Sequence, residues 1–273
     1  MAHELVIEAG RAERQYWKDL WRYRDLFFIL TWRDVAVQYK QTVVGILWAV
    51  LRPLLTMAAF TFVFAKVAKL PSEGVAPYPL MVFVAMLPWQ MFATAISAIA
   101  NSLVTNSNLV SKVYFPRIIV PAATMGVAVV DFVISFVLLA LMMVFYQYVP
   151  PVQMLAVLPL TLLAALVALG PGLILCALNV TYRDFRIIVP FITQFGLYLS
   201  PVGFSSGIVP DKWRLLYECN PMVGVIDGFR WAVLGSMECP VRALCISVGC
   251  AIVLLFYGIK TFRKTERTFA DVI

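Results

Sequence analysis

The amino-acid sequence predicts an all-α integral membrane protein with six transmembrane helices. Hydrophobic residues make up 62% of the chain and charged residues only 14%, whereas soluble proteins average about one half and one quarter. The apolar residues also gather in long runs, and roughly 20 apolar residues cross a bilayer as a helix. The fifth run is short and marginal for a span. The runs are Val43–Ala65, Leu80–Ala100, Ile118–Val149, Val152–Val180, Ile187–Phe204 and Val241–Ile259.

The runs divide the chain into three parts. Residues 1–42 form a cytoplasmic segment with an amphipathic interface helix, residues 43–262 form the six-span domain, and residues 263–273 form a cytoplasmic tail. With the N-terminus in the cytoplasm, most of the 22 Lys and Arg residues fall on the cytoplasmic side. This bias predicts that both termini are cytoplasmic. It also accounts for the net charge of +7 without a nucleic-acid partner.

Several chemistries lack the residues they need. The one histidine is His3, which leaves no histidine zinc site and no histidine-dependent triad. No Gly-Lys dipeptide occurs, so the nucleotide-binding P-loop is missing. Asp131 is the one acid well inside a predicted span, whereas ion-coupled transporters need several. We therefore expect no catalytic, cofactor-binding or metal-binding residue here, and energy supplied by another polypeptide.

The stretch "LTWRDVAVQYKQTVVGILWAV", residues 30–50, joins a polar helix to the first span. Arg33 and Lys40 lie nearer its apolar side and can reach lipid phosphates. The pattern predicts a helix in the headgroup plane with its apolar side toward lipid. The residues alone leave a membrane anchor and a coupling element equally open. The polar stripe consists of Thr31, Asp34, Gln38 and Gln41.

The first span contains a charge beside a proline, in "AVLRPLL". Arg52 places a cation at depth, and Pro53 removes a helical hydrogen bond. Asp131 in the third run is a candidate counter-ion for Arg52. The alternative is that Arg52 reaches the cytoplasmic interface by itself.

Two predicted cytoplasmic loops share one character. "NSNLVSKVYFPRIIVP" and "NVTYRDFRIIVP" are polar, basic and aromatic, and each closes on a proline at membrane re-entry. Such loops can form a docking surface for a partner. They can equally follow from the positive-inside bias alone.

A long external segment separates the fifth and sixth runs, at about residues 205–238. Its two short amphipathic pieces, Asp211–Cys219 and Met222–Leu234, are too short to span. They predict interfacial or re-entrant helices. Cys219 and Cys239 fall in this segment and can pair if that side is oxidising.

Aromatic and amide side chains recur on one face of the fifth run. Aromatic faces pack against sugar C–H surfaces, and amides bond sugar hydroxyls. A lipid-facing aromatic belt explains any single residue equally well. The fifth-run face contains Phe191, Gln194, Phe195 and Tyr198, and further aromatics are Phe60, Phe64, Phe83, Trp89 and Phe92.

The chain resembles the membrane subunit of ABC transporters that export polysaccharides, in the type-2 exporter class. The resemblance covers nearly the whole chain, and the order of the motifs is preserved. It is carried by "WRDVAVQYKQTVVGILWAVLRPLLTM", "NSNLVSKVYFPRIIVP", "ALNVTYRDFRIIVPF", "VPDKWR", "NPMVGVIDGFRWAVLG" and "RKTERTFADVI".

The resemblance implies a homodimer in the bacterial inner membrane with two copies of a cytoplasmic ABC ATPase. ATP and Mg would bind that partner. The cargo would be a lipid-linked polysaccharide, with O-antigen favoured; teichoic acid or capsule are alternatives, and a drug or small lipid fits less well.

The resemblance also assigns roles to residues. ATPase coupling falls to Arg33, Asp34, Gln38, Asn108, Lys112, Tyr114, Arg117, Tyr182, Arg183, Asp184 and Arg186. The substrate channel falls to Phe60, Phe64, Phe83, Trp89, Phe92, Phe191, Gln194, Phe195 and Tyr198. The external gate falls to Trp213, Asn220, Pro221, Met222, Phe229 and Trp231.

Overall fold

The computed structural model describes residues 12–40, 43–72, 76–182, 184–235, 238–266 and 269. Within these ranges the regular structure is helical and contains no strand, which confirms the predicted all-α class. The elements are α1 (Ala12–Arg22), α2 (Arg24–Lys40), α3 (Val43–Phe60), η1 (Thr61–Val67), α4 (Tyr78–Thr105), α5 (Ser107–Lys112), α6 (Ile119–Phe145), η2 (Val152–Ala156), α7 (Val157–Thr181), α8 (Phe185–Leu199), η3 (Ser206–Ile208), α9 (Asp211–Glu218), α10 (Pro221–Leu234) and α11 (Val241–Glu266).

Five stretches of the described chain are helical, long and apolar enough to cross a membrane. They correspond to five of the six predicted runs. The remaining run, the fifth along the chain, corresponds to α8. This helix has 15 residues and so extends about 22 Å, which is short of a bilayer core of about 30 Å. A total of six crossings therefore stays a prediction. The five are Leu47–Val67, Tyr78–Thr105, Ile119–Phe145, Val152–Thr181 and Val241–Glu266.

The fifth run ends early because its last residues form a packed loop. The helix stops at Leu199, and Ser200 has an extended backbone. The carbonyl groups that follow are bonded to side chains from elsewhere: the Tyr78 hydroxyl donates to the Gly203 oxygen at 2.5 Å. The Arg230 guanidinium donates to the oxygens of Phe204 at 2.9 Å and Val202 at 3.2 Å.

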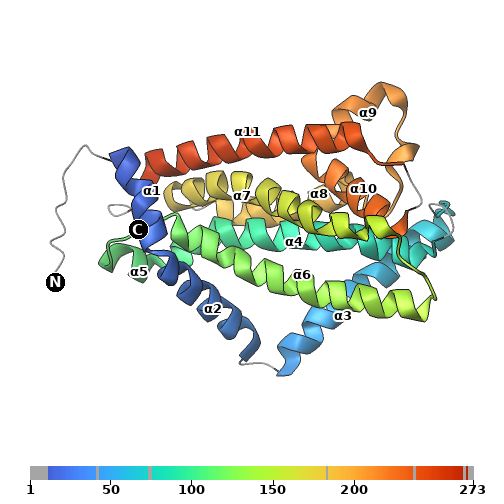
Figure 1. Ribbon diagram of the computed structural model, residues 1–273, viewed down its shortest axis with the longest axis horizontal. Coiled ribbons are helices and arrows are strands. Elements are labelled where there is room, and N and C mark those ends of the chain that lie inside the picture. The colour runs from blue at the N-terminus through green and yellow to red at the C-terminus, as the bar shows by residue number, and fades with distance from the viewer. Residues whose placement is uncertain are drawn as a thin grey trace.

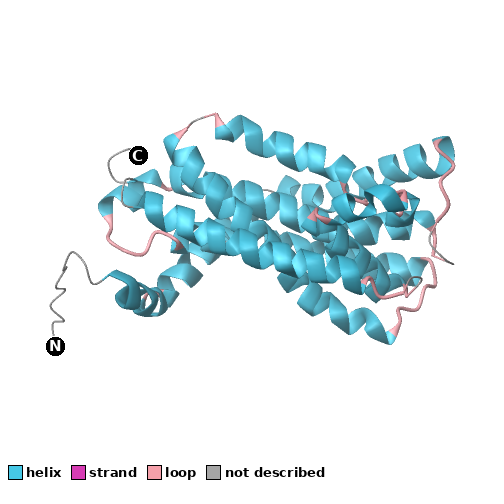
Figure 2. Cartoon of the chain, turned by 90° about the horizontal axis from the view of Figure 1, so that it is seen from above, coloured by secondary structure: helices cyan, strands magenta, loops and turns pink. Residues whose placement is uncertain are grey.

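The long helices run lengthwise, and the loops gather at the two ends of the molecule (Figures 1 and 2). Helix α4 lies at the centre and packs against α6, α7 and α10, while α11 packs against α7. One end of the bundle carries α1 and α5, and the other carries α9 and α10 (Figure 1). The fold thus separates two sets of short helices by the length of the bundle.

The α7–α11 contact depends on two glycines. A Cβ added to Gly258 would lie 2.4 Å from the Gly170 carbonyl oxygen, and one added to Gly170 would lie 2.6 Å from the Leu254 backbone. Small residues let membrane helices approach this closely, which improves dispersion contacts between them. The two glycines therefore set the spacing of the helices on this side of the bundle.

Candidate functional site

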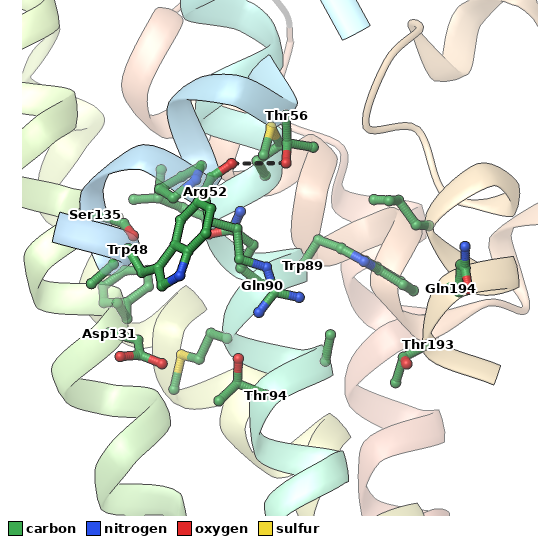
Figure 3. A pocket seen from close by; sticks show the side chains of 18 of the residues that line it. Trp48, Arg52, Thr56, Trp89, Gln90, Thr94, Asp131, Ser135, Thr193 and Gln194 are labelled. Carbon is green, nitrogen blue, oxygen red and sulfur yellow. Dashed lines mark hydrogen bonds between the residues drawn. The ribbon is translucent and has the colours of Figure 1, made fainter. Parts of the chain in front are cut away.

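A polar cavity of about 710 Å³ opens beside α3, between α4, α6 and α8. Figure 3 shows side chains from all of these helices pointing into it. It collects residues far apart in sequence, including the predicted Gln38, Arg52, Trp89, Asp131 and Gln194. Further polar and aromatic lining comes from Trp48, Thr56, Gln90, Thr94, Ser135 and Thr193.

Gln90 and Thr94 were not among the expected site residues. They lie four apart on α4, so they point to the same side of the helix. Two polar residues at helical spacing inside an apolar run are the signal that identifies such a position, because a polar group facing lipid is costly. Gln90 and Thr94 thus add polar lining from the central helix, which also contributes Trp89.

Asp131 finds its hydrogen-bond donors on α2. The Tyr39 hydroxyl donates to its carboxylate, and the Gln38 amide approaches the same oxygen at 3.5 Å. Arg52 lines the same cavity and is close enough to act on Asp131 electrostatically. Within the described chain the two form no direct ion pair, so their pairing stays a prediction.

Helix α2 turns its polar stripe toward the protein. Thr31 donates to the Ala123 oxygen at 3.3 Å, which joins α2 to α6. Burial, and then the hydrogen bond with Asp131, raise the pKa of Tyr39. The outer face is apolar, with Phe28, Ile29 and Trp32 all exposed. A helix is present where one is expected, but Thr31 and Gln38 bond to α6 rather than to lipid headgroups, and an interfacial role for α2 stays a prediction.

Arg33 occupies a different environment from the expected one. Its guanidinium donates to the Asp34 carboxylate at 2.7 Å and to the Asn106 amide oxygen at 2.7 Å. These bonds replace the expected reach to lipid phosphates, because they hold the guanidinium against Asp34 and Asn106. Arg33 and Asp34 therefore link α2 to the junction between α4 and α5. Lys40 is exposed, and Gln41 lies outside the described residues.

The two predicted loops lie at the same end of the bundle, because α4 and α7 run in the same direction (Figure 1). Tyr114 is exposed, and Arg117 is anchored: its guanidinium donates to the Glu266 backbone oxygen at 2.5 Å, and its backbone N–H to the Glu266 carboxylate at 2.8 Å. That link to α11 has no counterpart in the sequence pattern. Arg183 lies outside the described residues; the other loop residues predicted for coupling, all exposed or half-buried, are Asn108, Lys112, Tyr182, Asp184 and Arg186.

The aromatic residues predicted for the channel lie in different environments. Phe191 and Phe195 stack at 5.6 Å on the exposed face of α8, and Tyr198 stacks on Phe60 of α3 at 6.3 Å. Trp89 and Phe92 are nearly buried within the bundle, where Trp89 still reaches the cavity. The remaining two differ: Phe64 is half-buried beside Phe60, and Phe83 is fully buried.

Phe83 is a correction to the predicted set. Its side chain is 0% exposed and packs in the core around α4. Sequence periodicity could not separate it from its neighbours, because every residue from Leu80 to Leu87 is buried. Phe83 therefore contributes to packing and faces no open surface of the chain.

The segment between α8 and α11, predicted to be external, forms two helices where two are expected. They are confirmed as α9 (Asp211–Glu218) and α10 (Pro221–Leu234). Asn220 caps α10 by accepting from the Met222 N–H at 3.1 Å, and Pro221 follows at the first helical position. Of the predicted gate residues, Trp213 is exposed, Trp231 is half-buried, and Met222 and Phe229 are buried.

A charged cluster ties α9 to the start of α11. Glu218 is buried and lies 3.6 Å from Arg214 and 3.0 Å from Arg242. Burial, and then the nearby Asp227 carboxylate, raise the pKa of Tyr217. Cys219 and Cys239 are both free thiols, so the disulfide suggested for this segment is not formed in this structure.

Comparison with known proteins places these features in a family. The family model described as ABC-2 type transporter matches residues 25–234. The O-antigen export system permease protein RfbA of Myxococcus xanthus is 27% identical over 261 residues, covering 94% of this chain and 98% of that protein. A protein of the same name from Klebsiella pneumoniae is 24% identical over 251 residues, covering 91% and 95%.

A third relative is named for a different polymer. The capsule polysaccharide export inner-membrane protein CtrC of Neisseria meningitidis serogroup B is 24% identical over 258 residues, covering 92% of this chain and 95% of that protein. The family match extends from α2 to the end of α10 and includes the cavity, both loop regions and the helices α9 and α10. The chain therefore belongs to the ABC-2 type transporter family.

Proposed function

We propose that the chain is the permease subunit of an ATP-driven exporter that moves a lipid-linked polysaccharide, most simply O-antigen, across the inner membrane. The observation that carries this proposal is the end-to-end similarity to relatives named O-antigen export permeases. The polar and aromatic lining of the cavity supports it, since amides, hydroxyls and indole rings match the hydroxyls and C–H faces of sugars. Capsule export is the second candidate, because CtrC aligns over a similar length.

We propose that two copies of the chain assemble and that the channel forms between them. The exposed aromatic face of α8 and the exposed side of α3 supply the surfaces that a second copy would cover. A cysteine at Phe191 or Tyr198 should cross-link between copies in membranes, while one at Leu158, an exposed residue of α7, should not. Cross-linking at Leu158 alone would overturn this arrangement.

The ATPase would dock at the end of the bundle that carries α1, α5 and the α7–α8 connection. That end would be cytoplasmic, with residues 1–42 and 263–273 on the same side and the external gate at the other end. In this scheme the Arg33–Asp34–Asn106 link passes motion from the docked ATPase into α4. ATP and Mg would be held entirely by the partner.

Assays of the purified protein test whether ATP hydrolysis belongs to the partner subunit. We expect the chain alone to hydrolyse no ATP, and to support hydrolysis and export when reconstituted with its partner ABC ATPase. ATPase activity in the isolated chain would overturn the proposal. Complementation of strains lacking an O-antigen exporter or a capsule exporter separates the two candidate substrates.

Substitutions on α2 test the coupling role. Asp34→Ala and Gln38→Ala should leave membrane insertion unchanged and reduce export, because they remove polar links rather than apolar contacts. Trp32→Ala is the matched control, since Trp32 lies on the outer face of the same helix and is 74% exposed. Normal export in both polar variants would make α2 a membrane anchor.

A further inference from the structure

A second cavity, of about 970 Å³, lies at the end of the bundle that carries α1. It is bounded by α1, by the loop between α5 and α6, and by the last turns of α11. Apolar side chains form one wall, among them Val113, Phe115, Phe256 and Ile259. The cavity is separate from the candidate transport site: the two share no lining residue.

One face of α11 changes character as it reaches this cavity. Ile252 and Phe256 are both exposed, and Lys260 and Lys264 follow at the same spacing of four residues. Residues four apart lie on one side of a helix. An outward apolar stripe that ends in lysines places their ammonium groups at headgroup level, with the stems along the hydrocarbon.

The charges around the cavity are unbalanced. Its lining includes four cationic side chains, Arg117, Lys260, Arg263 and Lys264, and two carboxylates, Asp19 and Glu266. The Glu266 carboxylate is already occupied, because one oxygen accepts from the Arg117 N–H at 2.8 Å and the other from the Tyr16 hydroxyl at 3.2 Å.

Lys260 and Lys264 have no carboxylate partner in the part of the chain that the structure describes, so their charges can bind an anion. Within the described chain neither Lys260 nor Lys264 forms an ion pair, and both are exposed. Arg263, by contrast, stacks over the Tyr16 ring at 4.7 Å. Burial, and then the Glu266 carboxylate, raise the pKa of Tyr16, which keeps its hydroxyl a donor to Glu266. The frame is thus held by Tyr16, Arg117 and Glu266, and the lysines face outward.

We infer that this cavity binds the phosphodiester headgroup of an anionic phospholipid. Lys260 and Lys264 contact the phosphate, and the acyl chains lie along Phe256 and Ile252. Basic pockets between helices at the cytoplasmic surface recognise anionic headgroups in this way. The apolar stripe that leads into the cavity favours a lipid over a docking protein, because a protein partner would not require exposed Ile252 and Phe256 at hydrocarbon depth.

Native mass spectrometry of the full-length protein, delipidated in detergent, tests the site. Phosphatidylglycerol should be retained in preference to phosphatidylcholine. Lys260→Gln with Lys264→Gln should weaken phosphatidylglycerol binding about 25-fold, as expected for two lysines at a membrane surface. Lys260→Arg with Lys264→Arg should bind like the parent, because the charge is kept.

The matched control removes the same charge elsewhere. Lys69→Gln with Lys212→Gln changes two exposed lysines outside the cavity and should leave phosphatidylglycerol binding unchanged. Equal retention of the two lipids, or equal loss in both double variants, would overturn the inference. So would displacement of the lipid by millimolar inorganic phosphate, which marks a simple anion site. Loss of ATPase co-purification with lipid binding intact would assign the surface to the protein partner instead.

Discussion

The two sides of the bundle use apolar residues for different purposes. In the most apolar 18-residue stretch of α4, 67% of the residues are buried within the chain. In the equivalent stretch of the α3–η1 span, 6% are buried. Both helices are equally apolar by composition, with a mean hydropathy of 1.7. The comparison teaches that apolarity marks a membrane helix without telling whether it packs against its own chain or faces outward.

The outward side is also where the candidate site lies. Helices α3 and α8 supply Trp48, Arg52 and Gln194 to the cavity, while α4 supplies Trp89 and Gln90 from the packed side. The well-packed helix α4 thus faces the less buried helices α3 and α8 across the site. Such an arrangement lets one side move while the other keeps its shape, as an exporter requires.

The largest effect is expected in the packed half, at the α7–α11 crossing. Gly258→Ala should destabilise the protein by about 1–3 kcal/mol, because its Cβ would overlap the Gly170 carbonyl oxygen and push two backbones apart. Thermal unfolding in detergent measures the change.

Gly249 supplies the control on the same helix. A Cβ at Gly249 would meet nothing within 4 Å. Gly249→Ala should therefore be neutral or slightly stabilising, since glycine is unfavourable inside a helix by about 0.5–1 kcal/mol. Equal melting temperatures for the two variants would show that the packed side is not tightly constrained.

A smaller effect is expected where α2 joins the two halves. Tyr39→Phe should cost about 1–2 kcal/mol, because it removes the hydroxyl that donates to the Asp131 carboxylate. Tyr257→Phe, at an exposed position of α11, is the control and should change little. A neutral Tyr39→Phe would indicate that water replaces the hydroxyl at Asp131.

The pH dependence of the same pair gives an independent measurement. The pKa of Tyr39 in the folded protein lies above its unfolded value of about 10. The neutral hydroxyl is therefore favoured by folding, and its stabilisation is complete below about pH 10 and lost as the pH rises further. Tyr39→Phe should flatten the alkaline fall in melting temperature; an unchanged slope would contradict this.

The smallest effect on stability is expected on the outward side. Phe191→Ala with Tyr198→Ala should change the free energy of unfolding by less than about 0.5 kcal/mol, because both side chains are largely exposed on α8. Export by the reconstituted transporter should nevertheless fall severalfold. Leu158→Ala, another exposed apolar change, should preserve both properties. Destabilisation as large as that of Gly258→Ala would end the distinction between the two sides.

Sequence patterns located some elements closely and missed others for identifiable reasons. The short helices α9 and α10 follow from proline, asparagine and amphipathic spacing, which act locally. The end of α8 does not, because residues 201–204 are apolar but are held as a loop by Tyr78 and Arg230, which lie far away in sequence. Long-range hydrogen bonds overrode the local pattern there.

The candidate site shows the same limit. The sequence identified Arg52, Asp131, Trp89 and Gln194 as unusual residues, because charge, amide and indole groups stand out within apolar runs. It did not identify Tyr39 as the donor to Asp131, nor Glu266 as the acceptor for Arg117. Those partners are 92 and 149 residues away, and no local spacing encodes them.

The membrane class, the positions of the long helices and the chemistry available between them can be predicted from the amino-acid sequence. These depend on transfer of side chains out of water, which each segment undergoes largely independently. The three-dimensional packing set the burial of Phe83 in the core, the bond from Arg33 to Asn106 and the exposure of α3 and α8 on one side. The reason is physical: an apolar side chain is almost equally stable against lipid and against protein, so packing and long-range polar bonds make the choice.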